Sequence, residues 1–501
     1  MAKGLPIMIQ GTHSDAGKSV ITTGLCRVFY QDGYRTAPFK SQNMALNSYI
    51  TADGKEIGRA QGVQAEAACV QATTDMNPIL IKPNSETDSQ VVVHGKPYQN
   101  MKAMNYRKEF FEQGLKIIEE SYRRLENEYD CIVIEGAGSP AEINLNDREM
   151  VNMRVARMAN SPVILVGDIE KGGVFASLVG TLALLDEEDR NRVVGVIINK
   201  FRGDVNLLRP GLEWFEEYTG KKVLGVIPYV HNLNIEAEDS VVLSNYASTE
   251  NISKDIDIAV IRYPMISNFT DIDPFFNETD CHVRFIRSVK DLGEPDIIIF
   301  PGSKNTIEDL QFLRKTGIDN AVIKLIKEKN TTVVGVCGGY QMLGMEISDP
   351  FGVETSIGSM EGLRILPVHT VMKKEKLTVR SQGTIIYRSN QYQVEGYEIH
   401  MGQSANDCEG LISMCNRVDG SKTSDEKVIG TYFHGLFHND EFRHAFLNDV
   451  RSQKGLEPLK DRISVSALRE QAYDTLADHI RKHVDLLFIY EKMIQFHSNG
   501  Q

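Results

Sequence analysis

The sequence lacks the cysteine patterns that form disulfide frameworks or zinc sites. Its 501 residues include seven cysteines, an odd number, with neither a CxxC pair nor a Cys/His cluster of zinc spacing. The cysteines are Cys26, Cys69, Cys131, Cys281, Cys337, Cys408 and Cys415. Thiols scattered in this way predict a reducing compartment, in which the cysteines are buried or catalytic.

Long hydrophobic runs and an excess of positive charge are also missing. No apolar run approaches the roughly 20 residues of a membrane helix, and residues 1–6 are too short and mixed for a signal peptide. The formal net charge of −13 argues against nucleic acid or an anionic membrane as the main partner. We therefore expect a soluble cytoplasmic protein, and the sequence does not indicate its oligomeric state.

The chain is too long for one ordinary core, so two or three domains are expected. In its first half, short continuous apolar runs predict strands that are buried on both faces of a parallel sheet. They lie at residues 7–9, 131–134, 163–166 and 193–198, with helical stretches such as 101–129 between them. This alternation predicts a doubly wound α/β domain over residues 1–245.

A second α/β domain is predicted at residues 252–448. It follows a polar stretch at 231–256 that is typical of a linker. Its candidate strands lie at residues 258–261, 297–300, 333–336 and 428–433. In the remaining segment, 449–501, apolar residues recur about every four positions from Leu468 to Leu487, which predicts an amphipathic C-terminal helix packed on a core.

A glycine loop suited to phosphate lies between the first strand and a predicted helix at 20–30. It occupies residues 11–19 and ends in Gly17-Lys18-Ser19. Backbone N–H groups and the helix N-terminus would hold the phosphate oxygens. Lys18 would reach the β- and γ-phosphates, and Ser19 would bind Mg²⁺. The loop therefore predicts a nucleoside triphosphate site.

Further polar groups follow two strands of the same predicted sheet. The carboxyl ends of parallel strands face the ligand crevice of an open α/β sheet. Glu135 ends the strand at 131–134, and we predict it as a second Mg²⁺ ligand; the alternative is a solvated acid without a ligand. Asn199 follows the strand at 193–198 and is predicted to contact the nucleotide base, with ordinary capping as the alternative.

The second domain contains a cysteine at a sharp strand-to-helix turn. Cys337 follows the strand at 333–336, and its glycine neighbours leave room for the strained backbone of a nucleophile elbow. The N–H of Gly338 would point into an oxyanion hole, and the loop that contains Ser303 would supply a second donor. The thiol also needs a basic histidine. We predict His434 among the twelve histidines because it ends a strand and precedes a glycine.

These motifs resemble known families. The G-x-C-x-G elbow at 335–339 is similar to that of the class I glutamine amidotransferase domain, and the long G-x5-G-K-S loop resembles the dethiobiotin synthetase branch of phosphate-loop proteins. Class I domains usually have an acid two residues after the histidine. Here that position is Leu436, as in the cobyrinic-acid branch, so the partner that orients His434 is not identified. Segments along most of the chain resemble the cobyric acid synthase family: 39–48, 56–61, 135–142, 199–204, 396–402 and 430–437.

The resemblance implies an amidoligase that uses ATP, Mg²⁺ and glutamine and acts on small molecules. Such enzymes amidate the b, d, e and g carboxylates of adenosylcobyrinic acid a,c-diamide in cobalamin biosynthesis, through an acyl phosphate and ammonia released by the cysteine. Cobalt would arrive inside the substrate, so we expect no transition metal bound by protein ligands. The resemblance also implies a γ-phosphate contact for Lys40, a further Mg²⁺ ligand in Asp53, and corrinoid recognition by the amide-rich Gln42, Asn43 and Asn47.

Three alternatives stay open. A related amidoligase could act on the a and c carboxylates of the corrin ring or on a cell-wall carboxylate. A phosphate-loop switch protein of the partition or septum-site kind commonly has a second lysine early in the loop, whereas this loop offers only Lys18. A glutamine sensor without enzymatic activity is disfavoured by the intact Cys337 and His434.

Overall fold

The computed structural model describes residues 3–83, 88–102, 105–230, 233, 235, 253–406 and 410–499. Its contacts divide the chain into two compact units. We call the first the phosphate-loop unit; it comprises Met1–Ala45, Lys55–Ile235 and Leu468–Gln501. We call the second the cysteine unit; it comprises Leu46–Gly54 and Glu236–Ala467.

Two segments group differently from the domain boundaries predicted from the sequence. Residues 46–54 belong to the cysteine unit, although they lie within the first predicted domain. Residues from Leu468 onward belong to the phosphate-loop unit instead of forming an extension of their own. Most of the predicted linker at 231–256 lies outside the described residues, which include 233, 235 and 253–256 of this range.

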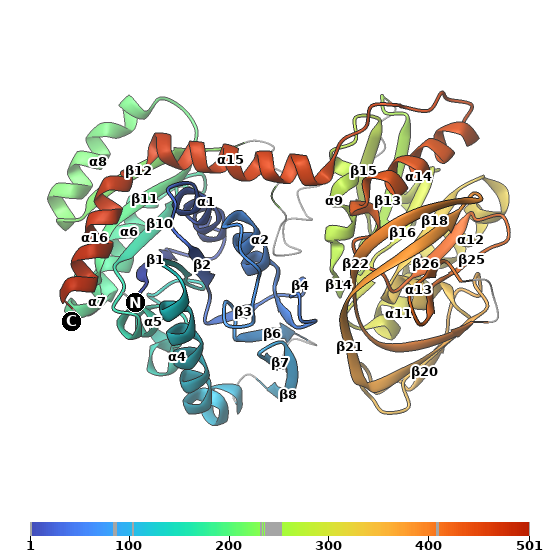
Figure 1. Cartoon of the computed structure of the whole chain (residues 1–501), viewed down its shortest axis with the longest axis horizontal. Helices are drawn as coiled ribbons and strands as arrows, with labels where there is room; N and C mark the ends of the chain where they lie inside the picture. Colours follow the sequence, from blue (N-terminus) through green and yellow to red (C-terminus); the bar gives the residue numbers. More distant parts are fainter. Residues whose placement is uncertain are drawn as a thin grey trace. The chain divides into compact units, whose positions relative to one another are not determined.

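The phosphate-loop unit is built on a parallel sheet with the strand order β12-β11-β10-β1-β9-β2. The strands are Lys222–Pro228 (β12), Val193–Phe201 (β11), Val163–Asp168 (β10), Leu5–Gly11 (β1), Cys131–Glu135 (β9) and Thr36–Phe39 (β2). The four predicted apolar runs all lie in these strands. Helices cover both faces of the sheet, so the central strands are buried and their sequences are continuously apolar (Figure 1). The α/β class is thus confirmed.

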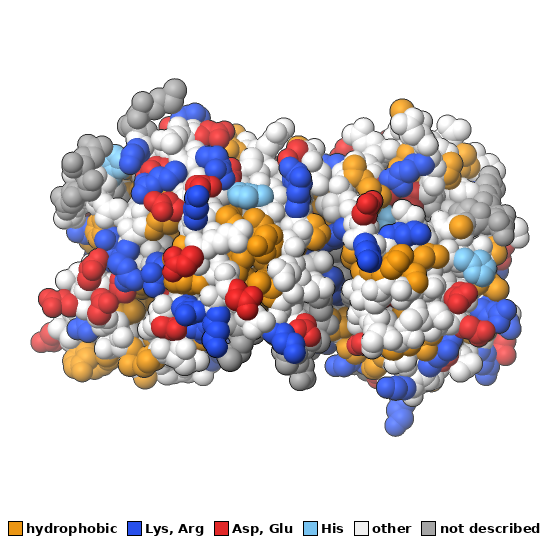
Figure 2. Space-filling model, turned by 90° about the horizontal axis from the view of Figure 1, so that it is seen from below, with side chains coloured by type: hydrophobic (Ala, Val, Ile, Leu, Met, Phe, Trp, Pro, Cys, Tyr) orange, Lys and Arg blue, Asp and Glu red, His pale blue; other side chains and the backbone are white. Residues whose placement is uncertain are grey.

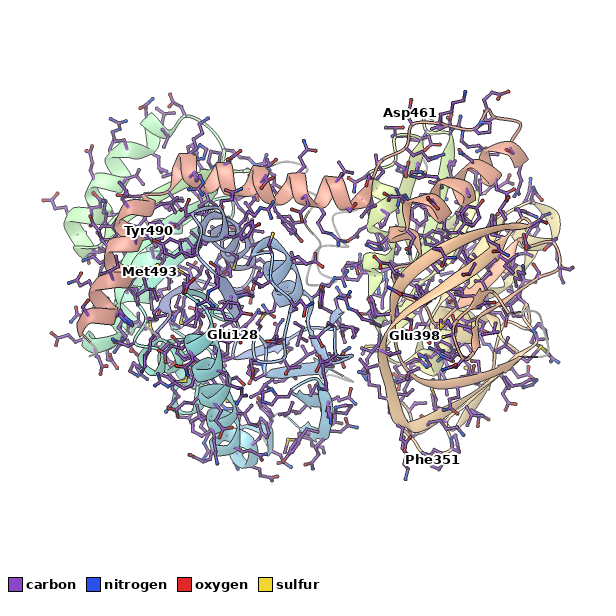
Figure 3. The ribbon with its side chains drawn as sticks, viewed as in Figure 1. Glu128, Phe351, Glu398, Asp461, Tyr490 and Met493 are labelled. Atoms are coloured by element: carbon purple, nitrogen blue, oxygen red, sulfur yellow. The ribbon has the colours of Figure 1, made fainter. Side chains whose placement is uncertain are left out.

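One face of this sheet is covered by helices from both ends of the chain. They share one apolar cluster with the sheet: α1 (Lys18–Gln31), α15 (Val465–His483) and α16 (Leu486–Asn499). The single C-terminal helix predicted from the sequence is therefore two helices. Figure 3 marks Tyr490 and Met493 on the second one, where Met493 is fully buried in the cluster.

The helix predicted at 101–129 begins later than the sequence suggested. Helix α4 spans Phe111–Glu128 after a π-helical turn, η1, at Tyr106–Phe110. Met101 lies instead in β8 (Lys96–Lys102), the last strand of a small sheet. The prediction was wrong there because nearly every residue of β8 is exposed, which leaves no alternating apolar pattern. The other strands of this sheet are β3 (Gln42–Met44), β6 (Ile79–Pro83) and β7 (Asp88–Val93).

The cysteine unit contains a second sheet, ordered β15-β13-β16-β18-β26-β25. All neighbours are parallel except β25, which runs antiparallel to β26. The strands are Cys281–Ile286 (β15), Ile256–Ile261 (β13), Ile297–Phe300 (β16), Thr332–Val336 (β18), Val428–Thr431 (β26) and Ser421–Lys422 (β25). The four predicted strands of this domain are confirmed, although β26 ends two residues before the predicted Phe433.

A long antiparallel hairpin, which the sequence analysis did not predict, completes this unit. It pairs β21 (Val368–Tyr387) with β22 (Asn390–Asn406). Its turn places Arg388 and Ser389 at positive φ values of 47° and 64°. Strand β22, on which Figure 3 labels Glu398, forms an antiparallel bridge between Tyr397 and His434. The hairpin therefore contributes directly to the surroundings of the predicted histidine.

The surface agrees with the mixed charge of the sequence. On the face drawn in Figure 2, Lys and Arg side chains are interspersed with Asp and Glu side chains, without an extended block of one sign. Among the helices of the described ranges, none combines the length and apolarity that a membrane span requires.

Candidate active sites

The phosphate loop joins β1 to α1, and its shape depends on Gly17. This residue has left-handed backbone at φ 98° and caps α1. A Cβ at Gly17 would lie 2.0 Å from Asn199 Nδ2, so the backbone favours glycine and any larger residue would force the Asn199 amide or the loop to shift. The Asn199 amide donates a hydrogen bond to Ala16 O at 3.0 Å. Asn199 thus holds the loop itself, and its contact with a base stays a prediction.

Two lysines also bind the loop backbone. Lys18 Nζ donates to His13 O at 2.9 Å and to Gly138 O at 3.2 Å. Lys200, which the sequence analysis did not assign to the site, donates to Asp15 O at 2.7 Å and to the Asp168 carboxylate at 2.8 Å. Its place next to Asn199 at a strand end was the signal that could have identified it. The hydrogen bonds to His13 O and Gly138 O place the Lys18 ammonium against the concave side of the loop.

Glu135, at the carboxyl end of β9, is the centre of this site. Its carboxylate is 1% exposed and accepts hydrogen bonds from Ser19 Oγ at 2.8 Å, Lys40 Nζ at 2.9 Å and Gln64 Nε2 at 2.5 Å. Burial opposes ionisation, but the Lys40 charge and these hydrogen bonds outweigh it and lower the pKa of Glu135. The structure thus brings Ser19 and Lys40 together around the ionised carboxylate of Glu135.

The oxygen atoms of Ser19 and Glu135 suit Mg²⁺, which proteins often bind through one or two carboxylates together with phosphates and water. Within the described parts of the chain, no group of three or more His, Cys, Asp or Glu side chains could hold a metal. Asp53 lies in the cysteine unit, where Thr51 Oγ1 donates to its carboxylate at 2.5 Å. Ser19 and Glu135 belong to the phosphate-loop unit, so Asp53 as a third Mg²⁺ ligand stays a prediction.

The three amide residues predicted for substrate recognition are divided between the units. Gln42 accepts a hydrogen bond from Tyr106 Oη at 2.5 Å, and Asn43 Nδ2 donates to Gln61 Oε1 at 3.0 Å. Both belong to the phosphate-loop unit, whereas the buried Asn47 belongs to the cysteine unit. Corrinoid recognition by these residues stays a prediction.

Cys337 occupies the strained elbow that the sequence predicted. It follows β18 and precedes helix α13 (Gly338–Leu343), with φ 52° and ψ −108°, a conformation that is rare for a residue with a side chain. The backbone is fixed because Cys337 N donates to Thr431 O at 2.8 Å. The side chain is mostly buried, and Sγ lies 3.7 Å from Ile399 O of β22. The thiol is thus held in one position at the end of the sheet.

The predicted oxyanion donors lie next to this thiol. Gly338 is the first residue of α13, where N–H groups have no partner within the helix. A Cβ at Gly338 would lie 2.9 Å from Ser303 N, so the two backbones approach closely. The Ser303 hydroxyl is occupied, since it donates to Asp309 at 2.6 Å. If Ser303 contributes to an oxyanion hole, it does so through its backbone.

His434 is fully buried beside the elbow. Its Nδ1 lies 2.7 Å from Asp271 Oδ2, and its ring stacks on Tyr397 with centroids 5.0 Å apart. Burial opposes protonation, but the Asp271 carboxylate outweighs it, and Cys337 adds to the effect, so the pKa of His434 is raised to about 10. The imidazole is therefore a cation at neutral pH. The sequence analysis missed Asp271, which lies 163 residues from His434.

Glu398 and His400, which lie in the segment 396–402 that resembles the family, form an internal network on β22. Glu398 is fully buried and is bound by Arg417 and by Ser381 Oγ at 2.6 Å. Burial opposes its ionisation, but hydrogen bonds from His400, Arg417 and Ser381 outweigh this and lower the pKa of Glu398 to about 2. The His400 ring stacks on Tyr432 at 3.8 Å. These contacts favour a structural role for both residues.

The two sites are chemically complementary. An ionised carboxylate, two lysines and a serine hydroxyl around a glycine loop can hold a nucleoside triphosphate and its cation. A strained cysteine beside a cationic histidine can attack an amide carbonyl as a thiolate and then protonate the departing nitrogen. One site can thus activate a carboxylate, and the other can release ammonia.

Comparisons with known proteins agree with this division. Residues 7–242 match the CobQ/CobB/MinD/ParA nucleotide binding domain, and residues 257–442 match the CobB/CobQ-like glutamine amidotransferase domain. The chain is 63% identical over 499 residues to a cobyric acid synthase of Geobacillus sp. (strain WCH70), with 99% of each chain covered. It is 63% identical to that of Anoxybacillus flavithermus (strain DSM 21510 / WK1), covering 99% of this chain and 98% of the relative. It is 49% identical to the cobyric acid synthase of Thermoanaerobacter sp. (strain X514), and the match covers 98% of this chain and 99% of the relative.

Proposed function

The chain belongs to the cobyric acid synthase family of ATP-dependent, glutamine-hydrolysing amidoligases, and we propose that its two units divide that reaction between them. The phosphate-loop unit activates a carboxylate, and the cysteine unit supplies ammonia. The substrate is adenosylcobyrinic acid a,c-diamide, which is amidated at its b, d, e and g carboxylates with one ATP and one glutamine for each amide. The full-length identity to relatives of this name supports the choice of substrate.

In the cysteine unit, the Cys337 thiolate attacks the side-chain amide carbon of glutamine. The developing oxyanion is placed near the Gly338 N–H and the Ser303 backbone. His434, protonated at neutral pH, gives its Nε2 proton to the leaving nitrogen, so ammonia departs and a thioester remains. Water then attacks the thioester while Nε2 takes its proton, and the released glutamate restores the thiolate–imidazolium pair. In the described residues, Nε2 has no hydrogen-bond partner that would compete for this proton.

In the phosphate-loop unit, a carboxylate oxygen of the substrate attacks the γ-phosphorus of ATP. Backbone N–H groups of the loop and the Lys18 ammonium hold the phosphates, because they concentrate positive charge where negative charge develops. Lys40 neutralises charge at the same place. The acyl phosphate then reacts with ammonia, the C–N bond forms, and phosphate leaves.

Mg²⁺ would be held by Ser19 Oγ and the Glu135 carboxylate. The ion would neutralise phosphate charge when ATP is bound. Ser19 Oγ lies 2.8 Å from Glu135 Oε1, which is the proximity that two oxygen ligands of one cation need. Lys40 bonds the same Glu135 oxygen, so its ammonium lies beside the oxygens that would hold the cation and would add positive charge there.

One observation carries this proposal: the same chain holds an ordered phosphate loop around Glu135 and, in a separate unit, a strained cysteine beside a charged histidine. The test supplies adenosylcobyrinic acid a,c-diamide, ATP and Mg²⁺ with either glutamine or an ammonium salt, and follows the products by mass spectrometry. We expect four successive gains of an amide.

Two variants separate the half-reactions. Cys337→Ser should stop amidation with glutamine and leave amidation with ammonium salt, because only ammonia release uses the thiol. Lys18→Ala should stop amidation with both nitrogen sources. Survival of the Lys18→Ala activity would remove the phosphate loop from the mechanism. Amidation of another carboxylate, with this corrinoid unchanged, would keep the mechanism and discard the substrate.

A further inference from the structure

The glutaminase site lacks the acid that usually follows the histidine in class I domains. The position two residues after His434 is Leu436, whose side chain is apolar and 1% exposed. A buried imidazolium without a carboxylate would be costly, because a desolvated charge needs a partner. We propose that Asp271, from a different part of the fold, is the positioning residue that replaces this acid. The inference rests on the proposed glutamine hydrolysis at Cys337.

The Asp271 carboxylate makes two contacts at the site, one with the histidine ring and one with the backbone. Asp271 Oδ2 lies 2.7 Å from His434 Nδ1, and Gly435 N donates to Oδ1 of the same carboxylate at 2.7 Å. Both oxygens are thus used, one on the ring and one on the backbone that follows it. Asp271 is 4% exposed and His434 is fully buried, so water does not weaken these bonds. These two contacts fix the rotation of the His434 ring and the tautomer that leaves Nε2 for the thiol.

The backbone around Asp271 explains why its side chain reaches the elbow. It lies in the 3₁₀ turn η4 (Phe269–Ile272), which begins after Asn268 at a positive φ of 50°. Just before it, β14 (Ile266–Ser267) pairs with β17 (Gly302–Ser303), the strand that carries the predicted oxyanion donor. The Asp271 turn is therefore tied to the same loop that borders Cys337.

The chemical consequence is a histidine that stays protonated when the free enzyme meets glutamine. The ionisable groups that face His434 are Asp271 from η4, Cys337 from the end of β18 and the Tyr397 phenol from β22. Of these, Asp271 makes the largest contribution to raising the pKa of His434. Removal of its charge should lower that pKa, so the alkaline limb of the pH–rate profile should move to lower pH.

The experiment replaces the acid in the full chain with its uncharged isostere, Asp271→Asn, and uses Asp273→Asn as the matched control. Both changes remove one carboxylate from the same segment, and the bonds to His434 Nδ1 and Gly435 N are made by Asp271. For Asp271→Asn we expect kcat for glutamine hydrolysis to fall on the order of 10⁴-fold, as for loss of a triad acid. The KM for glutamine and the ammonium-driven amidation should be unchanged, and the alkaline limb should shift downward. Asp273→Asn should retain the wild-type profile.

A fall in kcat of less than about tenfold with an unmoved alkaline limb would overturn the proposal, because a well-positioned proton-transfer group typically contributes about 10²- to 10⁴-fold. If Asp271→Asn also loses ammonium-driven amidation, Asp271→Glu decides the question. A Glu variant that hydrolyses glutamine faster than the Asn variant would support a role for the charge, and equal rates would refute it. Failure of the proposed function itself would look different, because wild-type protein would then not hydrolyse glutamine.

Discussion

The sharpest test of the phosphate loop is Gly17→Ala, paired with Gly33→Ala as a control. Both glycines have left-handed backbone, at φ 98° and 90°. A Cβ at Gly17 would lie 2.0 Å from Asn199 Nδ2, whereas a Cβ at Gly33 would have no atom within 4 Å. The two variants therefore share the backbone penalty and differ in the collision with Asn199.

The expected magnitudes follow from this difference. Left-handed backbone costs an alanine about 1–2 kcal/mol, so both variants should lose a similar free energy of unfolding from strain. Only Gly17→Ala must also displace the Asn199 amide or the loop. A displacement of about 1 Å at a reacting site costs on the order of 10²-fold in rate. We expect that loss in ATP-dependent amidation for Gly17→Ala and none for Gly33→Ala.

The assay is ammonium-driven amidation at saturating ATP, because it bypasses the cysteine unit. Thermal unfolding of both variants checks the shared penalty. The reasoning would be refuted if Gly17→Ala and Gly33→Ala retained equal amidation rates. It would also be refuted if Gly33→Ala lost as much activity as Gly17→Ala, since the shared backbone strain and not the Asn199 contact would then explain the loss.

Two further predictions concern pH. Lys40→Met removes the charge that lowers the pKa of Glu135, so the acid limb of the pH–rate profile for ammonium-driven amidation should move to higher pH. The profile is measured at a constant concentration of unprotonated ammonia. An unmoved acid limb with a reduced kcat would mean that Lys40 contacts substrate and does not control the ionisation of Glu135. Burial raises the pKa of Asp309 from 3.8 to about 7, against its hydrogen bonds from Ser303 and Met265 N. Its neutral form therefore contributes stability that is fully present below about pH 4 and is lost as pH rises through 7. The melting temperature should fall between about pH 4 and pH 7 and level off above that range, and Asp309→Asn should flatten part of that fall. An equally steep fall in the Asn variant would contradict the assignment.

The parts of the fold that the sequence predicted well are those with strong local patterns. Buried parallel strands such as β1, β9, β10 and β18 are continuous apolar runs, which are easily recognised. The hairpin of β21 and β22 was missed because its strands are partly exposed and rich in polar residues. The last two residues of strand β8, Met101 and Lys102, were assigned to a helix for the same reason. Helices α15 and α16 merged into one prediction because their apolar spacing continues across the break.

The candidate sites also divide into parts with a local sequence pattern, which were predicted, and partners that depend on long-range packing. The loop around Lys18 and the elbow at Cys337 were found because each is a strand, a glycine turn and a helix in direct succession. Their partners depend on long-range packing. Ser19 and Glu135 are 116 residues apart, and their bond could be expected only from the rule that parallel strands end at a common edge.

The chemistry of this protein can be read from short segments of its chain: which residues can hold phosphate, which thiol can attack an amide, and the family to which the chain belongs. The conformation of these segments is set by their own glycines and apolar residues. The contact of Asp271 with His434, the grouping of residues 46–54 with the cysteine unit, and the packing of the C-terminal helices on the phosphate-loop sheet became known from the three-dimensional structure. Such contacts join residues far apart in the chain and are selected by packing and burial of charge, for which no local pattern exists.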